Sequence, residues 1–529
     1  MYKSTSDGQI SLFPEFILPF GGHLDPENRW VKYAAIVPWD KIDEYYCKSL
    51  CDNNGRNAIS SRMAFSACFV KQYFGISDEE VPATIAENPY IQYFAGYTGF
   101  VAEKPFDSSM MVHFRKRFPV EFLSKVNECI NTGKWPEDER CVDYNDELKQ
   151  EEASGQSSEK REEHKDPNDD DHKPGGSTSN TSGESKPVNE HPENNKGRLI
   201  VDATVIPADI AFPTDVRLLD ECREKLEYAI LILWSLLPIH VGHMLPYVSK
   251  KAHQVYLDMS KSKKWTAAKL EDCIGKQLVY VEKALDRLDE LKKLVPNAEA
   301  VFPSWLNDRL AIIPLVYEQQ KYMFENGVHS VEHRIVSLQQ YFVRPIMRGK
   351  RPNPTEFGQK LHLSVVDGFT YLERTSWENF NESLDLKTTV EDFYRKFGCY
   401  PAAVLADKIY QTRENRKFCK ALGIRLSGPT LGRRNAEQAE EEKRQMYQDA
   451  CERNAVEGRN GNLKRRYGLD RVMSKLDETA KSEMCFSLIV MNSVHKLRKQ
   501  LFALIFKLAG MMPWSCLFHC EPFFQLAIF

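Results

Sequence analysis

Apolar residues spaced three and four positions apart mark the first part of the chain as helical. Such residues share one face of a helix, and the windows with this spacing are 40–50, 60–75 and 119–130. Ser77 and Glu80 supply a Ser-x-x-Glu capping signal for another helix. We therefore predict an all-α domain over residues 1–140.

The hydrophobic pattern stops in the segment 141–197. Residues 151–195 have almost no large apolar side chain, so this segment cannot offset its ordering entropy and is predicted to be a disordered linker. The segment 141–197 holds 15 Asp or Glu against 7 Lys or Arg, a net charge of −8. Because the whole chain carries −4, the remainder sums to +4, a mildly basic balance that permits DNA binding without proving it.

Strand-like patterns follow the linker. Branched apolar residues surround Asp202 in the stretch 197–206, which predicts a strand. The stretch 216–335 has helical spacing throughout. Two further strands, 360–366 and 369–377, are joined by Asp-Gly, the signature of a tight hairpin, so this aspartate is a turn residue rather than a catalyst.

The remaining elements alternate between helix and strand. They are a helix over 388–398, a short buried strand over 402–406 that ends at Asp407, a helix over 414–423, a strand over 424–428, and a long helix that contains Glu457. This order predicts an α/β fold with a ribonuclease-H-like mixed sheet and helices on both faces. The first strand would lie centrally, so that Asp202 and Asp407 share one edge of the sheet and the long helix lays Glu457 across them.

The long helix has an unusual mixture of charges. At helical spacing Arg453, Glu457, Asn460 or Gly461, and Lys464 form one stripe. An ion-paired, solvated face explains such a stripe. The alternative is a carboxylate that holds a metal while its cationic neighbours hold phosphate, and acids at two other points in a matching topology favour this alternative.

Several blocks of the chain resemble DDE transposases of bacterial insertion sequences. The blocks are 19–46, 87–100, 197–225, 343–369, 404–434 and 453–469. The resemblance implies a catalytic triad of Asp202, Asp407 and Glu457, with Arg453 and Lys464 completing a Tyr-x2-Arg-x3-Glu-x6-Lys signature. Two positions depart from the pattern: Ala450 replaces the tyrosine, and Asn460 stands where related sequences often have an aromatic residue.

The resemblance also implies a division of the chain. Its expected parts are a DNA-end-binding domain (1–140), the linker (141–197), a catalytic domain (198–215 and 336–508), a helical insertion (216–335) and an apolar tail (509–529). The expected enzyme binds terminal inverted repeats, cleaves DNA and transfers strands with two Mg²⁺ ions, for which Mn²⁺ can substitute. A ribonuclease-H-like nuclease without strand transfer and a catalytically silent DNA-binding descendant are the rival interpretations.

Double-stranded DNA is the expected partner, and the expected assembly is a homodimer when DNA is bound. The expected DNA-binding residues are Arg453, Lys464, Arg465, Arg348, Lys350, Arg115 and Arg117. For the last two, and for the loop that contains Arg348 and Lys350, a solvated polar surface is the alternative. No small-molecule substrate is expected.

A bacterial cytoplasm with nucleoid association is the expected location. The 13 cysteines are scattered without a CxxC pair, which suits a reducing compartment. Residues 228–249 lack charged side chains, but Pro and Gly interrupt them, so we predict a buried helix rather than a membrane span.

Overall fold

A computed structural model gives the fold of most of the chain. The residues it describes are 18, 22–50, 58–137, 189, 191–237, 246–262, 264–348, 355–429 and 436–508. Most of the predicted linker and all of the apolar tail lie outside these ranges.

The N-terminal region is helical, as its pattern predicts. Its helices are α1 (Arg29–Ile36), α2 (Trp39–Lys48), α3 (Ser61–Phe74), α4 (Val81–Glu87), α5 (Pro89–Phe94), α6 (Met110–Lys116) and α7 (Val120–Thr132). The Ser60 side chain caps α3 by accepting from the Met63 N–H, and Gly75 ends it in the left-handed conformation. The Glu80 carboxylate accepts from the Ser77 backbone N–H at 3.0 Å, which closes the turn before α4.

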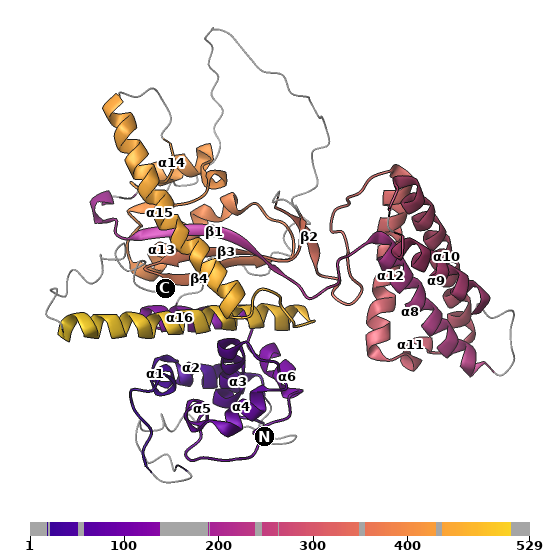
Figure 1. The fold of residues 1–529 in the computed structure, drawn as a ribbon, viewed down its shortest axis with the longest axis horizontal. Coiled ribbons are helices and arrows are strands. Elements are labelled where there is room, and N and C mark those ends of the chain that lie inside the picture. The colour runs from indigo at the N-terminus through magenta and orange to yellow at the C-terminus, as the bar shows by residue number, and fades with distance from the viewer. Residues whose placement is uncertain are drawn as a thin grey trace, which may run out of the picture.

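A second helical region follows the first strand and stands beside the sheet (Figure 1). It consists of α8 (Asp215–Leu236), α9 (Pro246–Ser260), α10 (Ala267–Leu294), α11 (Ala298–Val301) and α12 (Ser304–Asn326). Apolar faces of α8, α10 and α12 form a core of their own. The helical prediction is wrong beyond Asn326, because Gly327 ends α12 with φ 61° and the chain continues without a helix. None of the described helices is long and apolar enough to cross a membrane.

The described strands form one mixed sheet. They are β1 (Arg198–Pro207), β2 (Arg344–Met347), β3 (Thr355–Val366), β4 (Phe369–Ser376), β5 (Ala403–Leu405) and β6 (Arg425–Leu426). β1 lies between β3, to which it is antiparallel, and β5, to which it is parallel. β4 pairs with β3, and β6 with β5. β2, which the sequence pattern did not predict, pairs with the start of β3.

Asp367 and Gly368 make the hairpin turn between β3 and β4. Both have positive φ, 52° and 80°, as a two-residue type I′ turn requires. Asp367 is therefore a turn residue, as predicted.

Helices cover both faces of the sheet. α13 (Leu386–Phe397) and α14 (Arg413–Ala421) pack on one face, where Leu199 and Val201 of β1 point. Residues alternate between faces along a strand, so Asp202 points to the opposite face, which α15 (Ala436–Arg466) and α16 (Asp477–Leu508) cover. In Figure 1, α16 runs between the sheet and the N-terminal helices.

α16 joins the N-terminal helices to the sheet through one continuous hydrophobic core. Buried polar contacts reinforce the junction: the Asn127 amide of α7 donates to the Thr370 carbonyl at 3.1 Å, and Asn492 of α16 donates to Asn127 at 2.8 Å. Arg395 of α13 also makes a bidentate ion pair with Glu128, at 2.9 and 2.6 Å. The N-terminal helices therefore share their core with the rest of the molecule.

A buried histidine lies in the face of the sheet that η2 (Glu382–Asp385) and η3 (Lys408–Tyr410) border. His362 is fully buried and stacks on Tyr410 with ring centroids 5.8 Å apart. Neither ring nitrogen has a hydrogen-bond partner within the described structure. Burial, helped by Arg374 and Lys360, lowers the pKa of the His362 imidazole to about 3.

This lowered pKa predicts acid sensitivity. Below pH 6.5 the unfolded chain binds a proton at His362 that the folded chain does not, so stability is lost as pH falls toward 3, by about 1.4 kcal/mol per pH unit. We expect His362→Phe, which keeps the ring and removes no hydrogen bond, to raise Tm relative to wild type increasingly from pH 7 to pH 5. Thermal unfolding across this range measures the difference, with the exposed His329→Gln as control. An identical pH dependence in His362→Phe and wild type would contradict the assignment.

Candidate functional site

The parallel pairing of β1 with β5 places two of the predicted acids side by side just beyond its last pair, at a place called the sheet edge below. The paired residues end at Ile200 and Leu405, and each strand reaches its aspartate two positions later. Asp202 and Asp407 therefore emerge from neighbouring strands. The charge of Asp407 is among the causes that raise the pKa of the Asp202 carboxyl group.

The α15 helix lies across this edge and contacts it through one stripe of residues. The Arg453 guanidinium is 3.3 Å from an Asp407 oxygen. The Asn460 amide donates to Asp202 Oδ2 at 2.9 Å, and Lys464 Nζ donates to the Val205 carbonyl at 2.7 Å. These contacts confirm that Arg453, Asn460 and Lys464 face the same side of the helix.

Glu457 lies on α15 between Arg453 and Asn460, and its side chain is exposed. The carboxylate oxygens of Asp202, Asp407 and Glu457 do not all lie within 4.8 Å of one another. Among the described residues, the group of acids and histidine that meets this distance lies elsewhere in the fold. The fold thus brings all three acids to one region, with Glu457 on the solvent side.

Burial and charge act in opposite directions on Asp202. Burial raises the pKa of its carboxyl group above the ordinary value, and the charge of Asp407 raises it further. A hydrogen bond from the Ala203 backbone and the positive charges of Arg453 and Arg348 lower this pKa, but burial prevails. The positive charges of these two arginines therefore partly offset the negative charge of the acids.

The oxygen donors at this edge fit a hard divalent cation. Carboxylates and amide oxygens are the ligands that Mg²⁺ and Mn²⁺ prefer. Asp202, Asp407 and Glu457 supply the carboxylates. Asn460 Oδ1 is buried and accepts no hydrogen bond from the described residues.

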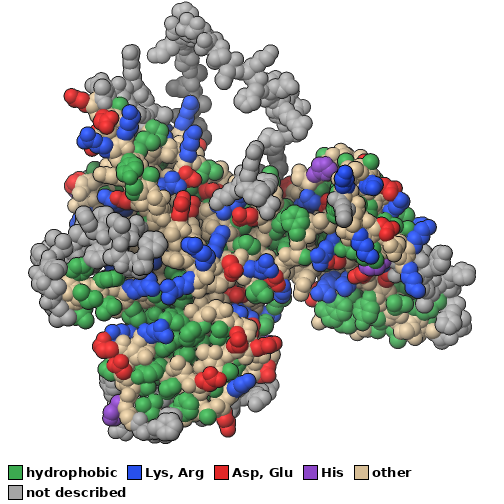
Figure 2. Space-filling model, in the orientation of Figure 1, with side chains coloured by type: hydrophobic (Ala, Val, Ile, Leu, Met, Phe, Trp, Pro, Cys, Tyr) green, Lys and Arg blue, Asp and Glu red, His purple; other side chains and the backbone are tan. Residues whose placement is uncertain are grey.

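Most of the predicted DNA-binding cations lie near this edge. Arg348 is 3.4 Å from the Ala203 carbonyl and 3.6 Å from Glu356, and Arg465 is exposed at the end of α15. Lys350 falls outside the described residues. Figure 2 shows Lys and Arg side chains over α15 and α16 on the visible face.

The interpretation of Arg115 as a DNA contact or solvated residue is wrong. Arg115 is 4% exposed, and its guanidinium makes a bidentate ion pair with Asp78, at 2.8 and 2.7 Å. Arg117 is partly buried, donates to the Tyr46 hydroxyl at 2.6 Å and lies over the Tyr46 ring. Of the three basic residues in this group, Lys116 is the exposed one.

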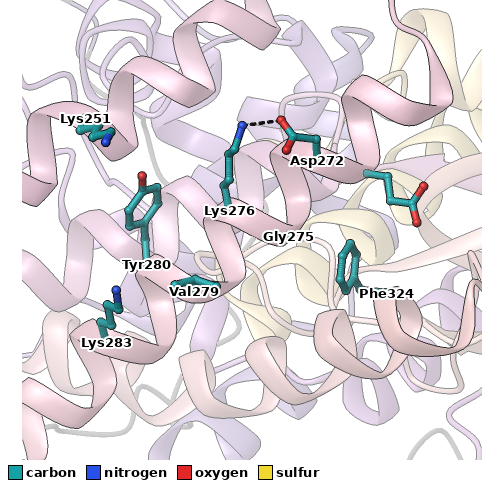
Figure 3. Close-up of a pocket in the computed structure, with 9 residues that line it drawn as sticks. Lys251, Asp272, Gly275, Lys276, Val279, Tyr280, Lys283 and Phe324 are labelled. Carbon is teal, nitrogen blue, oxygen red and sulfur yellow. Dashed lines mark hydrogen bonds and ion pairs between the residues drawn. The ribbon is translucent and has the colours of Figure 1, made fainter.

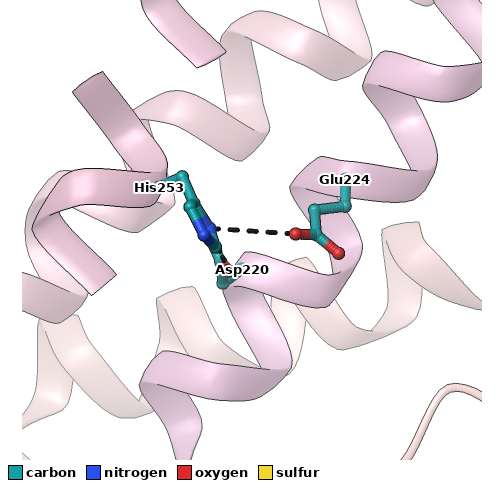
Figure 4. A group of neighbouring side chains, drawn as sticks. All are labelled: Asp220, Glu224 and His253. Atoms are coloured by element: carbon teal, nitrogen blue, oxygen red, sulfur yellow. Dashed lines mark hydrogen bonds and ion pairs between the residues drawn. The ribbon is translucent and has the colours of Figure 1, made fainter. Parts of the chain in front are cut away.

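Asp220, Glu224 and His253 form that other group, in the second helical region (Figure 4). Their possible ligand atoms all lie within 4.8 Å of one another. His253 of α9 is 3.2 Å from Asp220 and 3.8 Å from Glu224. The buried Arg223 already pairs with Asp220 at 2.7 Å, so this group is balanced by protein charges.

A shallow hollow of about 660 Å³ occupies the same helical region (Figure 3). It is lined by α9, α10 and α12, with Lys251, Tyr280 and Phe324 around it. Lys276 at its rim pairs with Asp272 at 2.5 Å. None of the acids on the sheet edge lines this hollow.

Two regions of the chain match transposase families. Residues 404–493 match the family described as "Transposase DDE domain", and residues 19–117 match "Transposase domain (DUF772)". The chain is 33% identical over 115 residues to "Uncharacterized protein ORF8 in nfe locus" of Rhizobium meliloti. That alignment covers 21% of this chain and 55% of the relative, so the chain spans about half the relative's length. No solved structure gives a significant match.

The burial of Arg115 leads to a prediction about stability. Arg115→Ala leaves the Asp78 carboxylate with Lys71 as its remaining close cation, so we expect a loss of up to about 3 kcal/mol and a clearly lower Tm. Lys116→Ala, at the exposed neighbour, should leave Tm within about 1 °C. Thermal unfolding of both variants tests this expectation, and equal Tm values would contradict the structural role.

Proposed function

We propose that this chain cuts and joins DNA at the sheet edge of Asp202 and Asp407. The two matched domains support a DDE transposase of insertion-sequence type. Its substrates would be the terminal inverted repeats of its element and a target DNA. The reaction would be in-line phosphoryl transfer, with a water and then a DNA 3′ hydroxyl as nucleophiles.

The position of α15 across the β1–β5 edge is the observation that best supports this proposal. Arg453 contacts Asp407 and Asn460 contacts Asp202, with Glu457 between them on the helix. The strand order β4–β3–β1–β5–β6, with β3 antiparallel to β1 and β5 parallel to it, is the order expected of a ribonuclease-H-like domain.

The chain's own residues would divide the work as follows. Asp202, Asp407 and Glu457 would hold two Mg²⁺ ions, or Mn²⁺ in their place. Bound divalent cations supply charge stabilisation for both the attacking and the leaving oxygen of the phosphodiester. Arg453 and Arg465 would bind phosphates on either side of the scissile bond. Because Lys464 donates to a β1 carbonyl, its first role is to fix α15 on the sheet.

DNA recognition would fall to other parts of the chain. We assign end recognition to the N-terminal helices and target or flanking contacts to the cations near Arg348 and over α15. The helical insertion of α8–α12 has an independent core, so it would extend the surface available to DNA or to a second copy in a DNA-bound homodimer. The expected location is the bacterial cytoplasm.

Substitution of the acids tests the catalytic assignment. We expect Asp202→Asn, Asp407→Asn and Glu457→Gln each to lower cleavage of element ends by about 10²-fold or more, since each removes a charge that acts on the transition state. End binding and Tm should stay near wild type. Glu441→Gln, an exposed acid on the same helix, is the matched control. If any of the three variants cleaves element ends in Mg²⁺ at the wild-type rate, the catalytic assignment of that residue is contradicted.

A strand-transfer assay separates the proposal from its rivals. With pre-cut ends, a transposase joins the 3′ hydroxyl to target DNA, whereas a nuclease leaves the pre-cut ends unjoined. A silent descendant would bind the ends and neither cleave nor join them. We expect joined products that depend on Mg²⁺ or Mn²⁺. If the protein cleaves element ends but yields no joined products, the nuclease interpretation is favoured.

A further inference from the structure

Asn460 lies at the sheet edge, and the two ends of its side-chain amide differ in their hydrogen bonding. Its Nδ2 donates to Asp202 Oδ2 at 2.9 Å. Its Oδ1 is buried, and no donor among the described residues reaches it. The N–H end of the amide thus has a partner in Asp202, and the oxygen end is a buried acceptor about one amide width away.

This arrangement is informative because a buried acceptor without a partner is costly. Such an oxygen loses its hydration on folding and regains nothing in return. Native proteins retain such groups where water, an ion or a ligand satisfies them. The orientation of the amide also follows from charge, since the carboxylate of Asp202 attracts the N–H end and leaves the oxygen end available.

Attachment of α15 to the sheet does not by itself require Asn460. Lys464 already fixes the helix to the Val205 carbonyl, and Arg453 pairs with Asp407. An apolar residue at position 460 would fill the same place without leaving a buried oxygen unsatisfied. A polar amide here therefore has a chemical use beyond packing.

We propose that Asn460 is a fourth residue of the cation site, an inference that rests on the proposed function. Its Nδ2 holds the carboxylate of Asp202 in orientation, and its Oδ1 is a neutral oxygen donor toward a divalent cation bound at Asp202. Amide oxygens are common ligands of hard divalent cations, alone or through a water. Asn460 thus acts on Asp202 as a positioning residue and on the cation as a donor.

Cation binding by the full-length chain tests this proposal independently of catalysis. Binding of Mn²⁺ is measured by electron paramagnetic resonance with wild type, Asn460→Ala, Asn460→Asp and Asp202→Asn. We expect Asn460→Ala to weaken Mn²⁺ binding by about 10-fold or more, as loss of a residue that orients a metal ligand does. Asn460→Asp loses the N–H that orients Asp202 but adds a second carboxylate beside it. Because the added negative charge attracts a cation, this variant should bind Mn²⁺ more tightly than Asn460→Ala.

The controls separate a role at the site from a structural one. Asn462→Ala removes an exposed asparagine from the same helix and should bind Mn²⁺ as wild type does. If Asn460→Ala binds Mn²⁺ within about twofold of wild type, the proposal is overturned, whatever its Tm. If Asn460→Ala fails to fold, the better-filling Asn460→Leu replaces it, and Mn²⁺ binding by folded Asn460→Leu within about twofold of wild type overturns the proposal. If wild type and Asp202→Asn bind Mn²⁺ equally, the proposed cation site itself fails, an outcome distinct from failure of Asn460 alone.

Discussion

The pairing of β1 with β3 on one side and β5 on the other is the constraint on which the rest of the structure depends. It makes β1 the centre of the sheet and brings Asp202 beside Asp407, just beyond the last β1–β5 pair. Carbonyl groups of β1 also accept hydrogen bonds from two side chains, Lys464 of α15 and Arg348 of the segment after β2. A shift of β1 by one residue would turn Asp202 to the opposite face and remove it from α15.

α15 and α16 have different functions around this strand. α15 makes directional contacts at Asp202 and Asp407 through Asn460 and Arg453, and its Leu463 is fully buried in the shared core. α16 is buried through apolar residues such as Met484 and Phe486, which belong to the core that the N-terminal helices share with the sheet. One helix thus sets the geometry of the site, and the other holds the frame that supports it.

Local patterns predicted much of this structure. Asp367-Gly368 specified the hairpin because type I′ turns need positive φ, and the short apolar strand before Asp407 was recognisable from its length and its neighbours. The stripe on α15 followed from helical periodicity alone. The closeness of Asp202 and Asp407 was predictable once the strand order was assumed, because the two acids lie at matching positions along parallel neighbouring strands.

Other features depend on contacts between distant residues and left no local signal. Arg115 has the sequence surroundings of an exposed basic group, and only the position of Asp78 in the fold makes it a buried ion pair. β2 is short, and its pairing with β3 defines it. The role of Asn460 depends on Asp202, 258 positions earlier in the chain. Periodicity predicts which face of a helix is buried, but not which partner buries it.

The shared core around α16 has a consequence for how such proteins diversify. If the N-terminal helices recognise DNA ends, as proposed, they do so while packed on a helix near the other end of the described chain, through Asn127, Asn492 and a common apolar surface. Recombination that exchanged residues 22–137 between two elements would place a foreign surface against α16. Recognition and catalysis would then have to evolve as matched halves, and new end specificities would arise more readily by substitution on the exposed side of the N-terminal helices than by exchange of the whole region.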